Sequence, residues 1–379
     1  MKKDKKENGN VLIDIYSNRQ VTKLKRMNKL VKALIIAGTS IVVLVATAII
    51  GINIFINSTI DEIKYEDNYE YLYDEPEIIA TEDSTGDITP QSKLVKNSKI
   101  LNIMLFGEDN NHGEKYGRSD TMLLLSIDSL HDKLKLTSFQ RDTYVQIPGH
   151  GKDKLNAAYN FGGPVLTIRT IQQNFGIQID RYAVVDFDGF KSIINTLGGV
   201  EIELTQDEID YINYQMYKNG QSKGKWTTIK DKPGLIKLNG QEALWYARNR
   251  GLTYGEDDNE IGISGDDWDR TSRQRKLITK MTKDLKDANV NQLISIVNSV
   301  APYIRTNLKK DEIRDLVFSA LSYMKYDIKQ KSIPDEGLWD YNEEGDAIWE
   351  EVGSCIVIND FAEQRYKLRE FIYEGDADY

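Results

Sequence analysis

The longest apolar stretch of the chain lies close to its N-terminus. Residues 33–56 read ALIIAGTSIVVLVATAIIGINIFI, and no charged residue occurs between Ala33 and Ile60. As a helix with a rise of about 1.5 Å per residue, this stretch would be about 36 Å long, enough to cross the hydrocarbon core of a bilayer. It is too long for the apolar region of a cleaved signal peptide, and it lacks the polar stripe of a soluble helix. The pattern therefore predicts a retained transmembrane helix.

The charges on the two sides of this predicted helix differ. Residues 1–32 contain ten Lys and Arg but three acids, whereas residues 57–92 contain one basic residue, Lys64, and many acids. Because positively charged flanks stay in the cytoplasm, we expect a single-pass protein of the cell membrane with a cytoplasmic tail, 1–32, and an extracellular body. Residues 57–98 are acidic and turn-rich, and we interpret them as an extracytoplasmic linker.

From residue 99 onwards, short apolar runs alternate with amphipathic stretches. Strands are predicted at 100–107, 121–128, 133–139, 181–187, 200–204, 327–333 and 355–358. Helices are predicted from near 163 to 175, at 189–197, 241–247 and 360–373, and near 270–287, 290–303 and 309–325. The polar, Tyr-rich residues 205–233 are interpreted as a lid or a surface excursion. Strands that alternate with helices favour one α/β domain over 99–379, with helices on both faces of the sheet.

Composition narrows the chemistry that this domain can perform. With 49 Lys and Arg against 59 Asp and Glu, the net charge is -10, which argues against a nucleic-acid partner. A single cysteine, Cys355, excludes a disulfide framework, a cysteine-ligated zinc site and an iron–sulfur cluster. No Walker-type glycine loop precedes a Lys-Ser/Thr pair, so nothing favours ATP chemistry of that kind.

Two acids stand where predicted strands meet a loop. Asp109 follows the first strand and Asp120 directly precedes the second, so both flank the loop 110–117. Ligands of α/β folds bind where strands end, and Mg²⁺ takes one or two carboxylates together with phosphate oxygens and water. A magnesium site fits this spacing, and so do ordinary N-caps and loop turns. Glu108, next to Asp109, leaves the first metal ligand ambiguous.

Basic residues follow the third predicted strand. Arg141 and Asp142 belong to the motif SFQRD, which places the arginine at the same end of the sheet as the two acids. A surface ion pair explains that spacing equally well. Lys154 stands near a helix start, where the helix dipole disfavours a cation unless it binds a ligand.

A cluster of arginines is the strongest signal. Arg270, Arg273 and Gln274 are spaced i, i+3, i+4 and therefore share one helix face. Guanidinium groups suit phosphate oxygens, and together with the two acids they predict a diphosphate bridged by magnesium. Pairing with nearby aspartates is the alternative. The five arginines, which lie within 28 residues, are Arg248, Arg250, Arg270, Arg273 and Arg275.

The stretches that carry these residues resemble the LytR–CpsA–Psr family of bacterial cell-wall proteins. They are collinear over roughly 99–280 and read LNIMLFGEDN, GRSDTMLLLSID, TSFQRDTYVQIPG, DKLNAAYNFGGP, DRYAVVDFDGF, INTLGGVEIEL, GLIKLNGQEALWYARNR and DDWDRTSRQRKLI. The resemblance implies an α/β/α sandwich with a central mixed sheet and a lipid-tail pocket among its apolar strands and helices. It also implies an extracytoplasmic domain behind a membrane anchor.

The same resemblance implies a phosphotransferase that uses Mg²⁺, with Mn²⁺ as the alternative ion. Such proteins move an anionic glycopolymer, for example teichoic acid or capsule, from undecaprenyl diphosphate to peptidoglycan and release polyprenyl phosphate. By motif, Asp109 and Asp120 match the metal-binding acids, and we take Asp120, Arg141 and Asp142 as catalytic, with Asp120 the first candidate for the base. Contacts to the diphosphate are implied for Arg118, Arg141, Lys154, Arg248, Arg250, Asp267, Arg270, Arg273 and Gln274.

Two other functions stay open from the sequence. A polyprenyl-diphosphate hydrolase would use the same pocket, with water in place of the sugar hydroxyl. A non-catalytic wall-associated regulator would bind the lipid or the glycan without turnover, and it would not need both Asp109 and Asp120.

Overall fold

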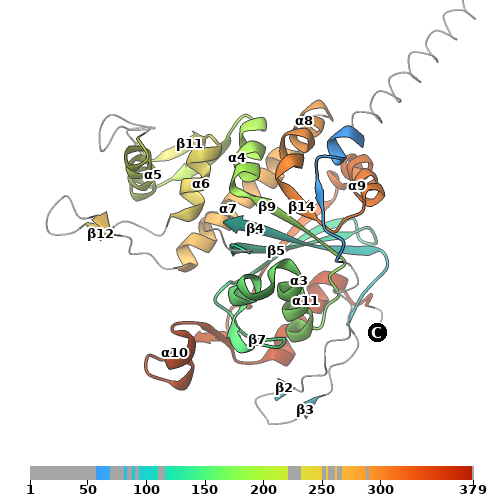
Figure 1. The fold of residues 1–379 in the computed structure, drawn as a ribbon, viewed down its shortest axis with the longest axis vertical. Helices are drawn as coiled ribbons and strands as arrows, with labels where there is room; N and C mark the ends of the chain where they lie inside the picture. The colour runs from blue at the N-terminus through green and yellow to red at the C-terminus, as the bar shows by residue number, and fades with distance from the viewer. Residues whose placement is uncertain are drawn as a thin grey trace, which may run out of the picture. The chain divides into compact units, whose positions relative to one another are not determined.

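A mixed sheet of seven strands forms the centre of the computed structural model (Figure 1). The strand order is β1-β14-β9-β4-β5-β6-β15. Within the described residues, each outer strand pairs on one side only, and β15 carries Lys329 and Lys331. The strands are β1 (Lys64–Tyr65), β4 (Ile100–Asp109), β5 (Arg118–Asp128), β6 (Lys133–Phe139), β9 (Arg181–Asp186), β14 (Ile304–Thr306) and β15 (Asp327–Ile333).

The structure describes residues 57–68, 81–82, 88–89, 94–109, 116–220, 232–249, 253–254, 261–262, 267–286 and 290–377. The predicted cytoplasmic tail, 1–32, and transmembrane helix, 33–56, lie outside these residues, as does part of the predicted linker. Within the described part of the chain, no helix combines the length and the apolar character needed to cross a membrane.

The pairing directions bring several strand ends to one end of the sheet. β4 runs parallel to β9, and β6 runs parallel to β15, while β5 is antiparallel to both β4 and β6. Therefore β4, β6, β9 and β15 all end where β5 begins. We call this end of the sheet its polar end, because the predicted site residues of β4, β5 and the segment after β6 lie there.

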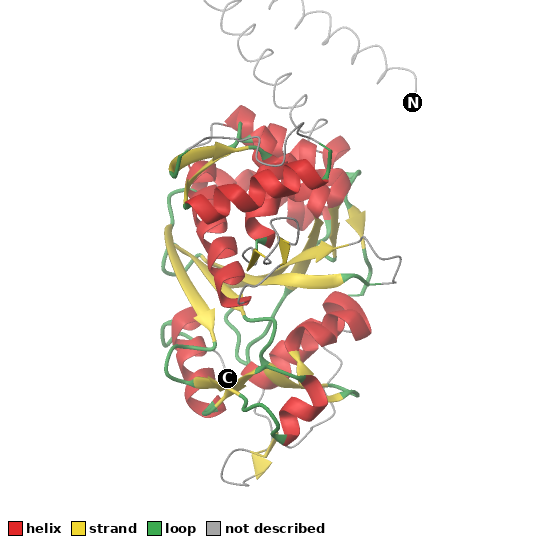
Figure 2. Cartoon of the chain, turned by 90° about the vertical axis from the view of Figure 1, so that its left-hand side faces the viewer, coloured by secondary structure: helices red, strands yellow, loops and turns green. Residues whose placement is uncertain are grey.

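Helices cover both faces of the sheet, as the sequence predicts (Figures 1 and 2). One layer contains α4 (Phe187–Thr196), α6 (Gly240–Arg248), α7 (Asp267–Lys286), α8 (Val290–Val300) and α9 (Lys310–Tyr323). The other contains α3 (Leu155–Phe175) and α11 (Phe361–Tyr373). The shorter elements are β2 (Thr81–Glu82), β3 (Ile88–Thr89), β7 (Tyr144–Ile147), β8 (Gly151–Lys154), β10 (Val200–Leu204), α5 (Gln206–Lys218), β11 (Gly234–Leu238), β12 (Thr253–Tyr254), β13 (Ile261–Gly262), η2 (Ala301–Tyr303), β16 (Trp339–Tyr341), α10 (Ala347–Val352) and β17 (Ile356–Ile358).

In the part of the chain that the structure describes, buried apolar side chains form two clusters. One lies between the sheet and the α3–α11 layer and includes Met104, Phe106 and Phe175. The other joins α5, α6 and α7 to the hairpin β10–β11 and includes Ile212 and Leu277. Since side chains alternate along a strand, the opposite face of β4 and β5 is turned toward this second cluster.

Helices α3 and α5 differ from the sequence prediction. α3 already begins at Leu155, and the Gly-Gly-Pro motif is a kink within it, because Gly162 and Gly163 have non-helical backbone angles. Gly163 has φ +65° and packs so closely on Tyr116 that a Cβ would lie 2.5 Å from the ring. Part of the expected surface excursion is helix α5, which buries Ile209 and Ile212.

The sheet also reaches beyond the boundary expected at residue 99. β1 pairs in parallel with β14, and Val95 is fully buried and bridges to Ile177. These short pairings were not predicted from the sequence, because the region is acidic. Parts of the predicted linker therefore belong to the folded body.

A close contact between α4 and α6 gives a first testable prediction. A Cβ on Gly240 would lie 2.3 Å from the carbonyl oxygen of Lys191, and the Gly240 N–H donates to Asn195 Oδ1 at 2.8 Å. Because helix backbones cannot yield as a flexible side chain does, we expect Gly240→Ala to lower the unfolding free energy by about 1–3 kcal/mol in urea titrations. Gln241→Ala, one position along the same helix, is the control. Equal stability of Gly240→Ala and the wild type would contradict the contact.

Candidate functional site

The two predicted metal-binding acids come from neighbouring strands at the polar end. Asp109 is the last residue of β4 and pairs with Arg118, the first residue of β5. Glu108 pairs with Ser119 but Gly107 pairs with Thr121, so Asp120 is the extra residue of a β-bulge. Bulges of this kind redirect side chains and are frequent beside active sites. The backbone thus brings Asp109, Arg118 and Asp120 together, although their side chains lie outside the described atoms.

Glu108 is excluded as a metal ligand by its own contacts. Its side chain is 2% exposed, and it accepts hydrogen bonds from Arg305 Nη2 at 2.6 Å and from the Tyr159 hydroxyl at 3.2 Å. Arg305 also pairs with Glu66 at 2.9 Å. Burial lowers the pKa of Arg305, but Glu108, Tyr159 and Glu66 together outweigh burial and leave that pKa raised. Glu108 is therefore a structural carboxylate, which leaves Asp109 as the acid at the end of β4.

This buried pair predicts a large loss of stability on mutation. Glu108→Ala leaves the Arg305 guanidinium with one carboxylate partner fewer in a mostly buried position. We expect the unfolding free energy to fall by about 3 kcal/mol, measured by urea titration. Glu201→Ala, at an exposed position of β10, should stay within about 0.5 kcal/mol of the wild type. A loss below about 1 kcal/mol for Glu108→Ala would contradict this role.

The loop after β6 brings Arg141, Asp142 and Lys154 together. Arg141 Nε lies 3.3 Å from Asp142 Oδ2, and both side chains are partly exposed. The Arg141 carbonyl accepts a hydrogen bond from the Asn156 N–H at 3.0 Å. Lys154 ends the hairpin β7–β8 and precedes α3, so the start of α3 holds it beside the loop. The SFQRD motif predicted that Arg141 follows a strand end, whereas the position of Lys154 beside it comes from the hairpin β7–β8.

A second group comprises Arg248 of α6 with Arg273 and Gln274 of α7. Its members contact different parts of the molecule. Arg248 and Gln274 line one cavity, and Gln274 Nε2 donates to the Ala247 carbonyl at 3.4 Å. Arg273 instead donates from Nε to Glu208 and from Nη1 to the Asn249 carbonyl, both at 2.9 Å. These contacts attach α7 to α5 and to the end of α6.

For three further predicted residues, the structure gives the burial of one and does not describe the side chains of the other two. Arg270 is 2% exposed on α7, which agrees with an inward position. Arg250 and the side chain of Asp267 lie outside the described residues. Contact of Arg250, Asp267, Arg270 and Arg273 with a diphosphate stays a prediction.

An apolar pocket of about 270 Å³ lies between the second cluster and the sheet. Its wall joins the polar ends of β4 and β5, through Gly107 and Thr121, to Arg248 and Gln274. The sequence alone could not place this pocket, because its wall combines five separate segments of the chain. Its apolar lining comprises Leu105, Phe106, Leu123, Val185, Phe187, Phe190, Ile193, Leu244, Ala247, Leu277, Ile278, Met281 and Leu285.

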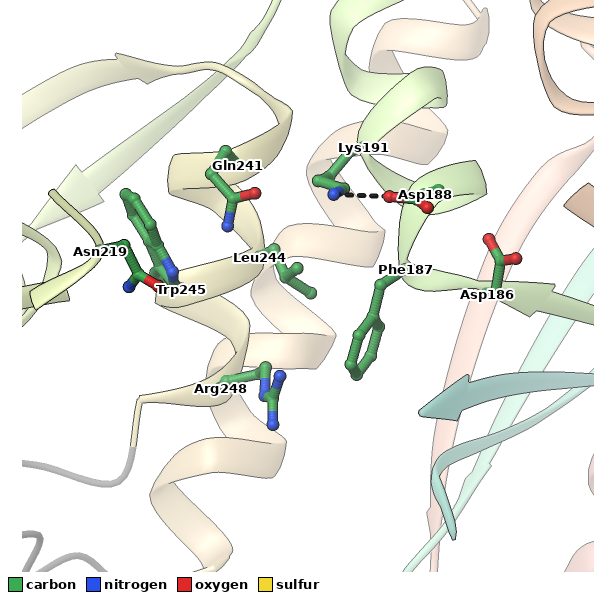
Figure 3. A pocket seen from close by; sticks show the side chains of 9 residues that line it. All are labelled: Asp186, Phe187, Asp188, Lys191, Asn219, Gln241, Leu244, Trp245 and Arg248. Atoms are coloured by element: carbon green, nitrogen blue, oxygen red, sulfur yellow. Dashed lines mark ion pairs between the residues drawn. The ribbon is translucent and has the colours of Figure 1, made fainter. Parts of the chain in front are cut away.

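A polar pocket of about 300 Å³ lies next to the apolar one, between α4 and α6 (Figure 3). The two pockets share Asp186, Phe187, Leu244 and Arg248. The Arg248 guanidinium carbon lies 4.8 Å from the centre of the Phe187 ring, and this contact holds the cation at the junction of the two pockets. The rest of the polar wall is Asp188, Lys191, Asn219, Gln241 and Trp245, of which Asp188 and Lys191 form an ion pair at 2.6 Å.

A different acidic group lies at the opposite end of the sheet. Asp128, His131 and Glu374 are close enough to share an ion. However, Lys135 Nζ lies 2.6 Å from Asp128 and 2.9 Å from Glu374, and the lysine is buried. The ammonium group therefore already supplies the positive charge, and this group serves to attach the C-terminus to the sheet.

Comparisons with known proteins agree with this geometry. The model of the LytR_cpsA_psr family matches residues 65–352. The regulatory protein MsrR of Staphylococcus aureus is 32% identical over 243 residues, which are 63% of this chain and 66% of MsrR. The polyisoprenyl-teichoic acid–peptidoglycan teichoic acid transferase TagU of Oceanobacillus iheyensis is 33% identical over 233 residues, 60% of this chain and 64% of TagU. The chain thus spans about two thirds of the length of these relatives.

A solved structure has the same fold. The crystal structure of Bacillus subtilis TagV superposes with a TM-score of 0.52 at 26% identity, covering 73% of this chain and 98% of that one. The central mixed sheet between two helix layers, predicted from the sequence, is thereby confirmed. Because the family model covers most of the chain, this protein belongs to the LytR_cpsA_psr family.

Proposed function

We propose that this protein is a phosphotransferase that moves an anionic glycopolymer from undecaprenyl diphosphate to peptidoglycan and releases polyprenyl phosphate. The observation that carries the proposal is the junction at Arg248. An apolar pocket and a polar pocket meet there, beside the strand ends that carry Asp109 and Asp120. A lipid tail, a diphosphate and a sugar follow one another in the donor in the same order. The names of TagU and of B. subtilis TagV, both teichoic acid transferases, support the same reaction.

In the proposed reaction, the prenyl tail occupies the apolar pocket and Arg248 and Arg141 bind the diphosphate. The acceptor hydroxyl attacks the phosphorus that carries the sugar. A phosphorus–oxygen bond to the acceptor forms as the bond to polyprenyl phosphate breaks, and Asp120 takes the hydroxyl proton. The arginines stabilise the charge on the departing phosphate.

The residues at the polar end fit a magnesium ion. Mg²⁺ prefers one or two carboxylates together with phosphate oxygens. Asp109 and Asp120 offer two carboxylates from adjacent strands, while Glu108 is engaged with Arg305. When bound, the ion would neutralise the diphosphate; Mn²⁺ suits the same oxygen ligands.

The location in the cell is proposed from the apolar run and the charges that flank it. Residues 33–56 would cross the bilayer, with the basic tail in the cytoplasm and the folded body outside. This places the pockets on the side of the membrane where peptidoglycan lies.

The test is a reconstitution of the full-length protein in nanodiscs. It receives a synthetic undecaprenyl-diphosphate-linked polymer, Mg²⁺ and peptidoglycan fragments, and the products are followed by mass spectrometry. We expect a polymer–glycan phosphodiester and undecaprenyl phosphate in equal amounts. Free polymer phosphate formed at the same rate without acceptor would identify a hydrolase instead.

The name of MsrR favours one alternative, a regulator that binds the lipid or glycan without turning it over. In that case the donor would bind in the reconstituted system, but no product would form with or without Mg²⁺. The absence of turnover together with tight donor binding would therefore replace the transferase proposal by the regulator.

A further inference from the structure

A third cavity lies along the free side of β15, at the polar end of the sheet. Its volume is about 650 Å³, within the range of roughly 300–1,000 Å³ that is typical of ligand pockets. We call it the β15 groove. Its wall consists of Gln330, Lys331, Ser332, Pro334, Asp335, Glu336, Trp339 and Phe371.

One wall of the groove is bonded to the residue before Arg141. Ser332 lies in this wall, and its Oγ accepts a hydrogen bond from Gln140 Nε2 at 3.4 Å. The Gln140 N–H also donates to the Ile333 carbonyl at 2.9 Å. The end of β15 is therefore fixed next to the start of the Arg141 loop.

The wall that contains Trp339 is bonded to the residue after Arg141. Trp339 belongs to β16, which pairs with β17, and Trp339 lies opposite Ile358. The Ile356 N–H of β17 donates to the Asp142 carbonyl at 2.9 Å. The strands β15 and β17, which support the two walls, thus each form a backbone hydrogen bond to a neighbour of Arg141.

The chemistry of the wall suits a neutral, hydroxyl-rich ligand. Trp339 offers an aromatic surface, and its ring is held edge-on by Tyr341 at 5.3 Å. The apolar face of a sugar ring packs on such a surface, while amide and hydroxyl groups such as those of Gln330 and Ser332 bond its polar rim.

The charges in the wall of the β15 groove disfavour binding of the undecaprenyl-diphosphate-linked donor. Lys331 and Asp335 form an ion pair, so their charges cancel, and Glu336 leaves the wall net negative. An anionic diphosphate or polymer is repelled by this wall, whereas an uncharged sugar hydroxyl is not. The β15 groove therefore differs from the polar pocket at Arg248, which offers a cation at the junction.

The two pockets flank the polar end from opposite sides. The polar pocket adjoins the end of β9, and the β15 groove adjoins the end of β15, with β4, β5 and β6 between them. Four strand spacings amount to about 19 Å. Ligands in both pockets can therefore extend toward the strand ends that carry Asp109, Asp120 and Arg141.

We propose that the β15 groove binds the hexosamine glycan of the acceptor and directs one of its hydroxyl groups toward the Arg141 loop. This inference rests on the proposed transferase function, because it assigns the acceptor to a place on the same site. Trp339 stacks on one sugar ring, and Glu336 accepts a hydrogen bond from a sugar hydroxyl.

The test compares Trp339→Ala and Glu336→Ala with the wild type, using the full-length protein in nanodiscs. The probe is a peptide-free tetrasaccharide of alternating N-acetylglucosamine and N-acetylmuramic acid, with the lactyl carboxyl groups amidated so that it carries no charge. Phe318→Ala, an exposed aromatic position on α9 outside all three pockets, is the matched control. Binding is measured by calorimetry, and the acceptor KM is measured in the transfer assay.

We expect Trp339→Ala to weaken tetrasaccharide binding and raise the acceptor KM by about tenfold, since truncation of one central aromatic contact commonly has that effect. Glu336→Ala should change both values about threefold by loss of one charge-assisted hydrogen bond. The donor KM and the melting temperature should stay as in the wild type. Glu336 is exposed, so its variant tests the groove even if Trp339→Ala is unstable.

Two outcomes separate this inference from the proposed function. Transfer by the wild type with unchanged tetrasaccharide binding and acceptor KM in both variants would overturn the acceptor assignment and leave the transferase proposal standing. Absence of transfer, with binding that still depends on Trp339, would leave the glycan site standing without the reaction. Binding of a stem peptide in place of the tetrasaccharide would overturn the assignment to the glycan.

Discussion

Arg141→Ala is expected to transfer glycopolymer about 10²–10³ times more slowly than the wild type, as is typical when one charge-stabilising donor is removed from a transfer site. Arg141 lies in the loop after β6, with Asp142 on one side and the start of α3 on the other. Its guanidinium would stabilise the charge on the departing phosphate. The loss should appear mainly in kcat, because that charge is greatest in the transition state.

The fold should tolerate this substitution. The ion pair with Asp142 is partly exposed, and such pairs contribute about 0–1 kcal/mol to stability. Arg314→Ala on α9, outside the three pockets, is the matched control and should retain full turnover. Wild-type turnover in Arg141→Ala, or equal loss in both variants, would contradict the assignment of Arg141.

The second large effect concerns Asp120. We expect Asp120→Asn to lower kcat about 10²–10³ times, because it removes both a carboxylate ligand for Mg²⁺ and the candidate base. The asparagine has nearly the same size, so the β-bulge between β4 and β5 should persist. Near-normal circular dichroism and melting temperature would verify this.

A second experiment on the magnesium site removes the metal ion and measures the transfer rate. EDTA should abolish transfer by the wild type, and Mg²⁺ or Mn²⁺ should restore it. Asp120→Asn should need a higher Mg²⁺ concentration for half-maximal rate, whereas Glu201→Gln on β10 should behave as the wild type. Full turnover in EDTA would remove the magnesium site from the proposal.

Much of the fold was predictable because its apolar pattern is regular. β4, β5 and β6 are apolar runs separated by polar turns, and α11 begins and ends within about one residue of its prediction. α5 was missed because its buried face is formed by Ile and Tyr in a highly polar segment. β1 was missed because two residues carry no periodic signal.

The strand-end positions of the basic and acidic candidate residues were predictable, but the contacts of their neighbours were not. The motifs place Asp109, Asp120 and Arg141 at strand ends, which the topology confirms as one end of the sheet. Nothing local indicates that Glu108 pairs with Arg305, since 197 residues separate them. That pairing depends on β14 and β9 lying beside β4.

The contacts of Arg273 also could not be predicted from the sequence motif. Helical spacing predicts that Arg270, Arg273 and Gln274 share one face, and all three lie on α7. It does not reveal that Glu208, in the missed helix α5, already binds the Arg273 guanidinium. A glutamate three residues after Thr205 marks a capping box, and that signal could have revealed both the helix and the partner.

The outer strands of the sheet have a consequence for self-association. An unpaired strand is a template on which another chain can add, and short length or lysines on the strand suppress this. β1 has only two residues, and β15 carries Lys329 at an exposed position. Two copies that met through β15 would bring like charges together. Even if crowded together, these molecules should therefore resist edge-to-edge fibril growth, and the free side of β15 stays open to ligands that are not peptides.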